Sequence, residues 1–217
     1  MWLADGIATV PGDARCGDLE ERARPWLFAS DRPEETIGAW IARGGGDLLW
    51  ELLGPTRAQV LGIAARTRDG RIVRFGGRVV KNVAGYDLAR AFAGARGELG
   101  TVVEAHLRLR PPPRGWRAAV RAGTEPGEAL SGPGSAVWDG RTVRFLRRGE
   151  ATPPGYDGCD PLEARASLRP GWARVRSLVP FGEARGILLA GPRRVGVEGE
   201  PPPKTGALWE RLRRAFA

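Results

Sequence analysis

A glycine-rich stretch in the first half of the chain carries the residues best suited to chemistry. Residues 76–88 read GGRVVKNVAGYDL, and residues 94–104 read GARGELGTVVE. Because glycine permits positive φ and has no Cβ, Gly85, Gly97 and Gly100 would let backbone amides approach a flat ligand. Amides at the start of a helix near Leu88 would also attract a diphosphate or another anion. The spacing favours a large cofactor, with glycines required for turn shape alone as the alternative.

Two side chains of this stretch have both a functional and an ordinary interpretation. Lys81 is one of only two lysines among 34 basic residues. Either the position requires a compact ammonium group, or Lys81 is an ordinary solvated lysine. Tyr86 can stack on a ring system or hydrogen-bond to it, and it can equally be a half-buried packing residue. Asp87 is better explained as a helix N-cap than as a base.

Few other residues offer catalytic chemistry. His106 is the only histidine and has no partner that the sequence identifies, so a structural role is expected. Arg57 could pair with a carboxylate or phosphate, but a surface arginine is the default in this chain. Cys16 and Cys159 lie far apart with no second ligand residue near either, which argues against a zinc site or a disulfide. No catalytic residue and no metal are assigned.

The elements that position this stretch are predicted from hydrophobic periodicity and from glycine and proline. Residues 60–67 and 71–75 predict a hairpin with its turn at Asp69 and Gly70. Residues 101–109 alternate as a strand with one wet face. Further expected elements are a strand at 6–10, a helix at 17–24 capped by Asp18, and a helix at 87–93.

Three prolines at 111–113 form the clearest seam, and the domain boundary is placed there. Residues 1–113 are expected to form one domain and residues 114–217 a small second one. Short strands are expected at 116–121, 135–138, 142–147, 172–179 and 186–190, loops at 152–160 and 196–203, and an amphipathic helix at 208–216. Hairpins mixed with short helices indicate an α+β fold rather than a doubly wound sheet.

Length and composition describe an ordinary folded protein. The chain has 217 residues, of which 42% are hydrophobic and 27% charged. The first residues, MWLADG, form no basic or apolar leader, and no apolar run approaches the roughly 20 residues that cross a bilayer. A soluble, cytoplasmic protein is therefore expected.

Basic residues are numerous and nearly all are arginine. The formal net charge is +9, and the 34 basic residues include only two lysines. The arginines are spread among acidic residues and no RNA-recognition, KH or zinc-finger fingerprint is present, so nucleic-acid binding is not expected. A basic face that docks an acidic partner ranks higher. The arginine bias and the proline-rich loops also favour heat resistance and a thermophilic source.

The order of residues in the glycine-rich stretch resembles a known family. KNVAGYDL at 81–88, GxxGxLGTVxEA from Gly94 and LxLxP ending at Pro111 together resemble the second FAD-contacting segment of FAD-linked oxidases. These oxidases are of the vanillyl-alcohol-oxidase or p-cresol-methylhydroxylase (PCMH) type. The form FGGRVVKNVAGYD at 75–87 is most similar to glycolate oxidase E subunits. The resemblance implies an α+β FAD-binding domain with an antiparallel or mixed sheet, followed by a small α+β cap domain.

The resemblance also implies which residues hold FAD. TIGAWIA at 36–42, with the glycines that follow, is similar to the family's diphosphate loop, although Ala39 stands where the family prefers glycine. Residues 208–217 resemble the family's closing helix. The cofactor-binding set implied by position is Thr36, Gly38, Gly44, Gly45, Gly46, Lys81, Gly85, Tyr86, Leu88, Gly97, Gly100 and Val102.

The family's chemistry implies partner chains. Oxidation of a 2-hydroxy acid by flavin needs a base for the hydroxyl proton, and the sequence offers no histidine constellation for it. The resemblance therefore implies an FAD-binding subunit of a glycolate or related 2-hydroxy-acid oxidase. Catalysis would lie in a D-type FAD-binding subunit, and an iron–sulfur subunit would take the electrons. Membrane contact would be indirect, through the complex at the inner membrane face.

One departure from the family keeps a second hypothesis open. The first subdomain, whose loop grips the diphosphate from one side, is expected to be shortened because few residues precede Thr36. Half a cradle would bind FAD weakly or only with a partner. The alternative is a non-catalytic assembly subunit of the same complex that keeps the fold and has lost stable FAD binding.

Overall fold

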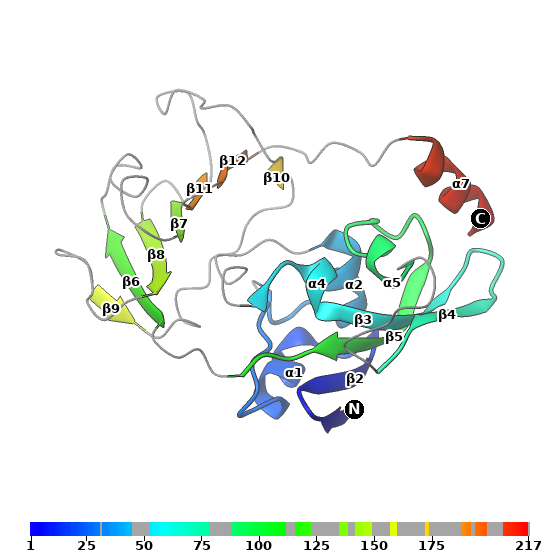
Figure 1. Ribbon diagram of the computed structural model, residues 1–217, viewed down its shortest axis with the longest axis horizontal. Coiled ribbons are helices and arrows are strands. Elements are labelled where there is room, and N and C mark those ends of the chain that lie inside the picture. Colours follow the sequence, from blue (N-terminus) through cyan, green and yellow to red (C-terminus); the bar gives the residue numbers. More distant parts are fainter. Residues whose placement is uncertain are drawn as a thin grey trace. The chain divides into compact units, whose positions relative to one another are not determined.

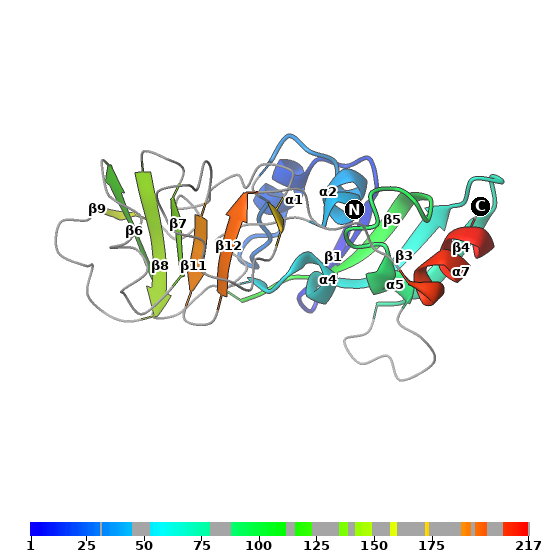
Figure 2. The same ribbon diagram turned by 90° about the horizontal axis from the view of Figure 1, so that it is seen from above.

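The chain folds around two separate sheets, as a computed structural model shows (Figure 1, Figure 2). The structure describes residues 1–30, 32–44, 53–78, 88–111, 116–122, 135–138, 142–148, 157–159, 172–173, 188–191, 194–198 and 206–216. Contacts divide the chain into two units. The first unit contains Met1–Gly45, Leu53–Pro112 and Pro203–Ala217, and the second contains Gly46–Leu52 and Pro113–Pro202.

The sheet of the first unit has five antiparallel strands in the order β1-β2-β5-β3-β4 (Figure 1). The strands are β1 Trp2–Ala4, β2 Ile7–Pro11, β3 Val60–Arg66, β4 Ile72–Gly76 and β5 Thr101–Arg108. The predicted hairpin is confirmed as β3 and β4, and Gly70 in its turn has a φ of 85°. Glycine adopts that backbone conformation without the penalty of a Cβ, which explains the Asp-Gly turn.

Strand β5 lies at the centre of this sheet and follows the alternation predicted for residues 101–109. Val102, Ala105 and Leu107 are buried, whereas Glu104 and His106 alternate with them and are half-buried. The pairing with β3 has two register shifts, one between Val60 and Gly62 and one between Ala64 and Ala65. β5 therefore keeps one apolar face through both irregularities.

Short helices cover the apolar face of this sheet. The helices are α1 Cys16–Arg22, α2 Ile37–Arg43, α4 Thr56–Gln59, α5 Leu88–Ala91 and α7 Ala207–Ala215. Leu19 of α1, Ile41 of α2 and Ala89 of α5 join the same core cluster as Val102 and Leu107. Burial of such side chains stabilises the fold by roughly 25 cal/mol per Å² of apolar area.

The expected cap of the first helix is wrong. α1 begins at Cys16 after Arg15, and Asp18 lies in its first turn instead of at the N-cap. A carboxylate in the first turn still interacts favourably with the positive end of the helix dipole. The acidic residue was therefore a correct sign of a helix start but not of the first helical residue.

The sheet of the second unit has seven antiparallel strands in the order β10-β12-β11-β7-β8-β6-β9. The strands are β6 Trp116–Ala122, β7 Ser135–Trp138, β8 Thr142–Arg148, β9 Asp157–Cys159, β10 Trp172–Ala173, β11 Leu188–Gly191 and β12 Arg194–Glu198. β9, and the end of β12, lie where loops were expected. β9 pairs with β6, and the end of β12 pairs with β10 and β11, so tertiary structure overrides weak local propensity there.

The C-terminal helix α7 returns to the first unit, which corrects the expectation that residues 114–217 form one second domain. Phe216 lies 5.6 Å from Phe75 and 5.7 Å from Phe92, measured between ring centroids. The Trp209 indole donates a hydrogen bond to Glu98 Oε2 at 3.3 Å, and Arg213 Nε lies 3.2 Å from the same oxygen. Aromatic contacts and a shared carboxylate therefore attach the chain end to β4 and to the turn before β5.

The two antiparallel sheets with short helices confirm the α+β class. None of the helices that the structure describes has the length and apolarity needed to span a membrane.

We predict that Phe216→Ala detaches α7 from the sheet. Removing a buried aromatic ring costs about 3–5 kcal/mol in a core and leaves a gap beside Phe75 and Phe92. Hydrogen exchange should show faster exchange of the amides of residues 207–215 while β3 and β5 stay protected. Leu208→Ala is the matched control on the same helix, because Leu208 is 69% exposed. Equal loss of protection in both variants would contradict the role given to Phe216.

Candidate functional site

The structure describes some of the residues predicted to bind FAD and not others. Those described are Thr36, Gly38, Gly44, Leu88, Gly97, Gly100 and Val102, whereas Gly45, Gly46, Lys81, Gly85 and Tyr86 lie outside the described residues. Helix α2 joins several of them, because Thr36 is its N-cap and Gly44 its C-cap. The two ends of α2 are therefore the centre of the candidate site.

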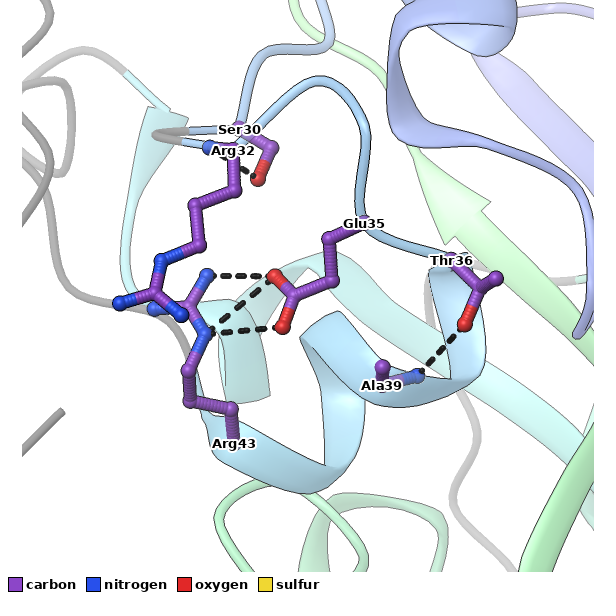
Figure 3. Close-up of polar contacts among 6 residues, drawn as sticks. All are labelled: Ser30, Arg32, Glu35, Thr36, Ala39 and Arg43. Atoms are coloured by element: carbon purple, nitrogen blue, oxygen red, sulfur yellow. Dashed lines mark hydrogen bonds and ion pairs between the residues drawn. The ribbon is translucent and has the colours of Figure 1, made fainter.

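The start of α2 packs against two strand ends through glycine. The Thr36 hydroxyl accepts a hydrogen bond from the Ala39 amide at 3.3 Å and so caps the helix (Figure 3). The Gly38 amide donates to the Gly12 carbonyl at 2.7 Å. A Cβ on Gly38 would lie 3.0 Å from the Gly12 carbonyl oxygen and 3.1 Å from that of Val102. The structure thus brings Thr36, Gly38 and Val102 together, in close backbone packing.

The end of α2 packs against the turn that precedes β5. Gly44 closes the helix with a φ of 82°, and its amide donates to the Trp40 and Ile41 carbonyls. The Gly94 amide also donates to the Ile41 carbonyl, at 2.9 Å, and a Cβ on Gly44 would lie only 2.9 Å from the Gly94 Cα. The two glycine-rich segments are therefore in contact, as a shared site requires, and the turn satisfies carbonyls at the helix end.

Arg43, which precedes the glycine run, forms an ion pair within the protein (Figure 3). Its Nη2 lies 2.6 Å from Glu35 Oε2, and its Nε donates to Oε1 at 3.0 Å. Both side chains are mostly buried, at 17% and 13% exposed. A two-point contact of this kind is among the stronger polar interactions in proteins, so the guanidinium braces α2 against the segment before it.

The turn at 97–100 contains one packed glycine and one open glycine. Gly100 has a φ of 124°, and a Cβ there would lie 2.5 Å from the Arg66 carbonyl oxygen. Gly97 has a φ of 78°, and a Cβ there would meet no atom within 4 Å. Gly97 is therefore the described glycine of the predicted set whose backbone faces open space.

A further glycine contact, which sequence reasoning missed, directs the chain after β4. A Cβ on Gly62 would lie 2.6 Å from the Gly77 amide nitrogen, and that amide donates to the Leu61 carbonyl at 3.3 Å. Gly76, with a φ of 68°, lets the chain turn across β3. The signal in the sequence was Gly62 inside an apolar strand, because an isolated strand glycine often marks close backbone approach.

The described residues do not form an empty cradle for FAD. At Gly38, Gly44 and Gly100 the space of a side chain is filled or crowded by the protein's own backbone. Val102 is 5% exposed, and Leu88 begins the short helix α5 with a half-buried side chain. Packing therefore explains these glycines without a cofactor, whereas residues 79–87, which carry the rest of the motif, lie outside the described part of the chain.

His106 has the structural role expected from the sequence. Its Nδ1 lies 3.0 Å from the Thr9 hydroxyl on β2, and its Nε2 lies 4.0 Å from Glu104 Oε1. Burial lowers the pKa of His106 below its ordinary value, the Glu104 charge opposes that shift, and the Arg78 charge adds to it. The imidazole therefore favours the neutral form and connects two strands.

A depression of about 430 Å³ lies on the first unit and is lined by Met1, Pro11, Ala14, Asp18, Glu21 and Arg22. Its two carboxylates would repel a diphosphate, so it is a poor candidate for the cofactor. Among the residues that the structure describes, no group of three histidine, cysteine or acidic side chains could hold a metal ion.

We predict that Gly100→Ala destabilises the protein more than Gly97→Ala, with no flavin present. Both glycines have positive φ, which costs an L-residue about 1–2 kcal/mol, but only the Gly100 variant adds a clash with the Arg66 carbonyl. Urea denaturation of the two variants gives the comparison. Equal losses would contradict the packing role of Gly100.

We predict that His106→Gln removes a pH dependence of stability. Because the folded pKa of His106 lies below its ordinary value of 6.5, the unfolded chain binds the proton first as pH falls. Stability should therefore be full above about pH 7 and should fall as pH drops through 6.5 toward the folded pKa. His106 is the only histidine, so the unfolding free energy of the variant should be nearly flat in that window. A wild-type decline that persists in the variant would assign the proton elsewhere.

Comparison with curated proteins relates a segment of this chain to FAD-linked oxidoreductases. The chain is 45% identical over 78 residues to glycolate oxidase subunit GlcD of Bacillus subtilis, covering 36% of this chain and 17% of that protein. It is 43% identical over 83 residues to glycolate oxidase subunit GlcE of Escherichia coli, covering 37% of this chain and 23% of that protein. The chain thus spans about a fifth of the length of the curated relatives that it matches. No family model matches it.

Solved structures share the fold at low sequence identity. Phl p 4, a grass pollen allergen with glucose dehydrogenase activity, matches with a TM-score of 0.60 at 16% identity, over 98% of this chain and 62% of that chain. Alkyldihydroxyacetonephosphate synthase matches with a TM-score of 0.52 at 13% identity, over 69% and 36%. The likeness confirms the expected α+β fold of the PCMH type. The chain therefore shares its fold with these solved structures and one sequence segment with the two glycolate oxidase subunits.

Proposed function

We propose that the chain is an FAD-binding subunit of a glycolate or related 2-hydroxy-acid oxidase or dehydrogenase. The observation that carries the proposal is the 43% identity to GlcE over 83 residues, in a chain that contains FGGRVVKNVAGYD at 75–87. Further relatives are a D-lactate dehydrogenase of Archaeoglobus fulgidus at 37% identity and a D-2-hydroxyglutarate dehydrogenase of Xanthomonas citri at 40%. Glycolate, lactate and 2-hydroxyglutarate are all 2-hydroxy acids, so that class is the proposed substrate.

The proposal assigns the chemical step to a partner chain. Flavin, when bound, accepts the hydride from the hydroxyl-bearing carbon, and a base must take the hydroxyl proton. The described residues offer only His106 as a histidine, and it is tied to Thr9. A D-type subunit is therefore the proposed site of oxidation, an iron–sulfur subunit takes the electrons, and the complex lies in the cytoplasm beside the inner membrane.

A second function of the same complex is favoured by the packed glycines. Gly38, Gly44 and Gly100 are explained by contacts inside the fold, so these residues would be required even in a subunit without flavin. An assembly subunit that keeps the fold and has lost stable FAD binding is therefore the alternative.

Titration with FAD separates the two functions. We predict that FAD fluorescence is quenched when the purified chain is added, alone or together with its D-type and iron–sulfur partner chains. Gly85→Val should weaken the binding because it places a bulky side chain on the turn predicted to touch the cofactor. Gly77→Ala is the control, since Gly77 has an ordinary φ and a Cβ there would meet nothing within 4 Å.

Each result assigns one function. Quenching by the wild type and by Gly77→Ala, with loss in Gly85→Val, supports the flavin subunit. A wild-type chain that leaves FAD unquenched both alone and in the reconstituted complex, while the complex still assembles, supports the assembly subunit instead.

A further inference from the structure

The five-stranded sheet has a second face, turned away from the core. Residues paired across antiparallel strands point to the same side of the sheet. The register aligns Trp2 with Thr9, Thr9 with His106, and Ala64 with both Glu104 and Arg74. The core strand residues alternate with these positions, and α1, α2, α5 and α7 contribute buried residues to that core. The opposite side, which carries Trp2, Arg66, Arg74, Glu104 and His106, is called the outer face.

The glycine crossing after β4 places a charged residue over this outer face. Gly77 passes directly above Gly62 of β3, because a Cβ on Gly62 would lie 2.6 Å from the Gly77 amide nitrogen. The next residue, Arg78, then lies with its guanidinium carbon 4.9 Å from the centroid of the Trp2 ring. Trp2 remains 43% exposed beneath it. An arginine over an indole is a preorganised pair, since cation–π attraction holds the long side chain in place.

Some arginines of the first unit pair with carboxylates, and others do not. Arg43, Arg71 and Arg213 each form an ion pair with a carboxylate. Among the described residues, Arg66, Arg74 and Arg78 form no such pair, and all three are exposed. Glu104 is the acidic side chain that the register places on this face, and its Oε1 lies 4.0 Å from His106 Nε2. The outer face therefore has an excess of positive charge.

We propose that the outer face binds an acidic surface of another protein chain, with Arg74, Arg78 and Trp2 at the centre of the contact. Exposed tryptophan and arginine are the residue types that most often dominate protein interfaces. Ile72, 41% exposed and paired with Arg66, extends the surface with apolar area. The identity of the partner rests on the proposed function, which makes it the D-type subunit.

Charge excludes the simplest other occupant. A second copy of this chain would bring another net charge of +9 toward the same arginines, and like charges across an interface repel each other. A partner rich in aspartate and glutamate is attracted instead, and its carboxylates can pair with guanidinium groups at two points. Trp2 and Ile72 give such a partner apolar contact that a purely electrostatic ligand would not use.

Charge reversal tests the proposal. Calorimetric titration of the D-type subunit from the same organism into the wild-type chain should show binding that weakens as salt is raised. Arg74→Glu with Arg78→Glu should weaken that binding at least about tenfold, because repulsion replaces attraction at the centre of the contact. Trp2→Ala should weaken it at high salt as well. Thermal melting verifies that these exposed substitutions leave the fold intact.

A matched control comes from helix α7. Arg211 and Arg214 are exposed there, and Arg211→Glu with Arg214→Glu changes the net charge by the same amount on another surface. Binding by this control should stay within about threefold of the wild type if the outer face is the contact. Equal weakening in both double variants would overturn the proposal, because net charge alone would then explain the effect.

Other outcomes also decide the question. A wild-type chain that does not bind the D-type subunit at low salt overturns the proposal. The same holds if the outer-face arginines mediate binding to phosphatidylserine vesicles or duplex DNA while the protein complex is unaffected by their reversal. FAD quenching by the Arg74→Glu and Arg78→Glu variant keeps the two proposals apart, since flavin binding without partner binding contradicts only the docking surface.

Discussion

Direct contact between backbone segments, allowed only where a residue lacks a Cβ, is the constraint on which the first unit depends. Gly62 admits the crossing chain at Gly77, Gly38 admits the carbonyls of Gly12 and Val102, and Gly100 lies against the Arg66 carbonyl. The contacts at Gly38 and Gly100 join elements that are far apart in the sequence. Replacement of hydrogen by a methyl group at these points forces a backbone shift, which a close-packed interior resists. The glycines thus set the spacing between α2, β3, β5 and the chain after β4.

Local sequence signals predicted some elements of this unit, but they could not predict contacts between residues far apart in the sequence. The hairpin of β3 and β4 and the central strand β5 were predictable because their signals are local: an Asp-Gly turn, and apolar residues at every second position. The amphipathic helix at the C-terminus was predictable as a helix, but the surface against which it packs was not. Its place is set by Phe75 and Phe92, more than a hundred residues away, and no local pattern encodes that contact.

The candidate site shows the opposite balance. A motif can state that glycine is required without stating whether a ligand or the protein's own backbone requires it, because both need the absence of a Cβ. Coordinates separate the two at Gly44, where the Gly94 Cα fills the space, and at Gly97, where nothing does. Packing within the fold accounts for Gly38, Gly44 and Gly100, and the cofactor-binding role of the predicted residues stays a prediction.

The two sides of the sheet use the guanidinium group of arginine in two different ways. On the core side, the Arg43 guanidinium meets a carboxylate at two points while mostly buried, a geometry that a lysine ammonium cannot reproduce. On the outer face, Arg78 stacks on Trp2, which again uses the planar, weakly hydrated guanidinium. The two uses differ in one respect: the first is satisfied within the chain, whereas the second leaves the charge exposed. The arginine charges that stay unpaired on the outer face contribute to the net charge of +9, and they are available to a partner.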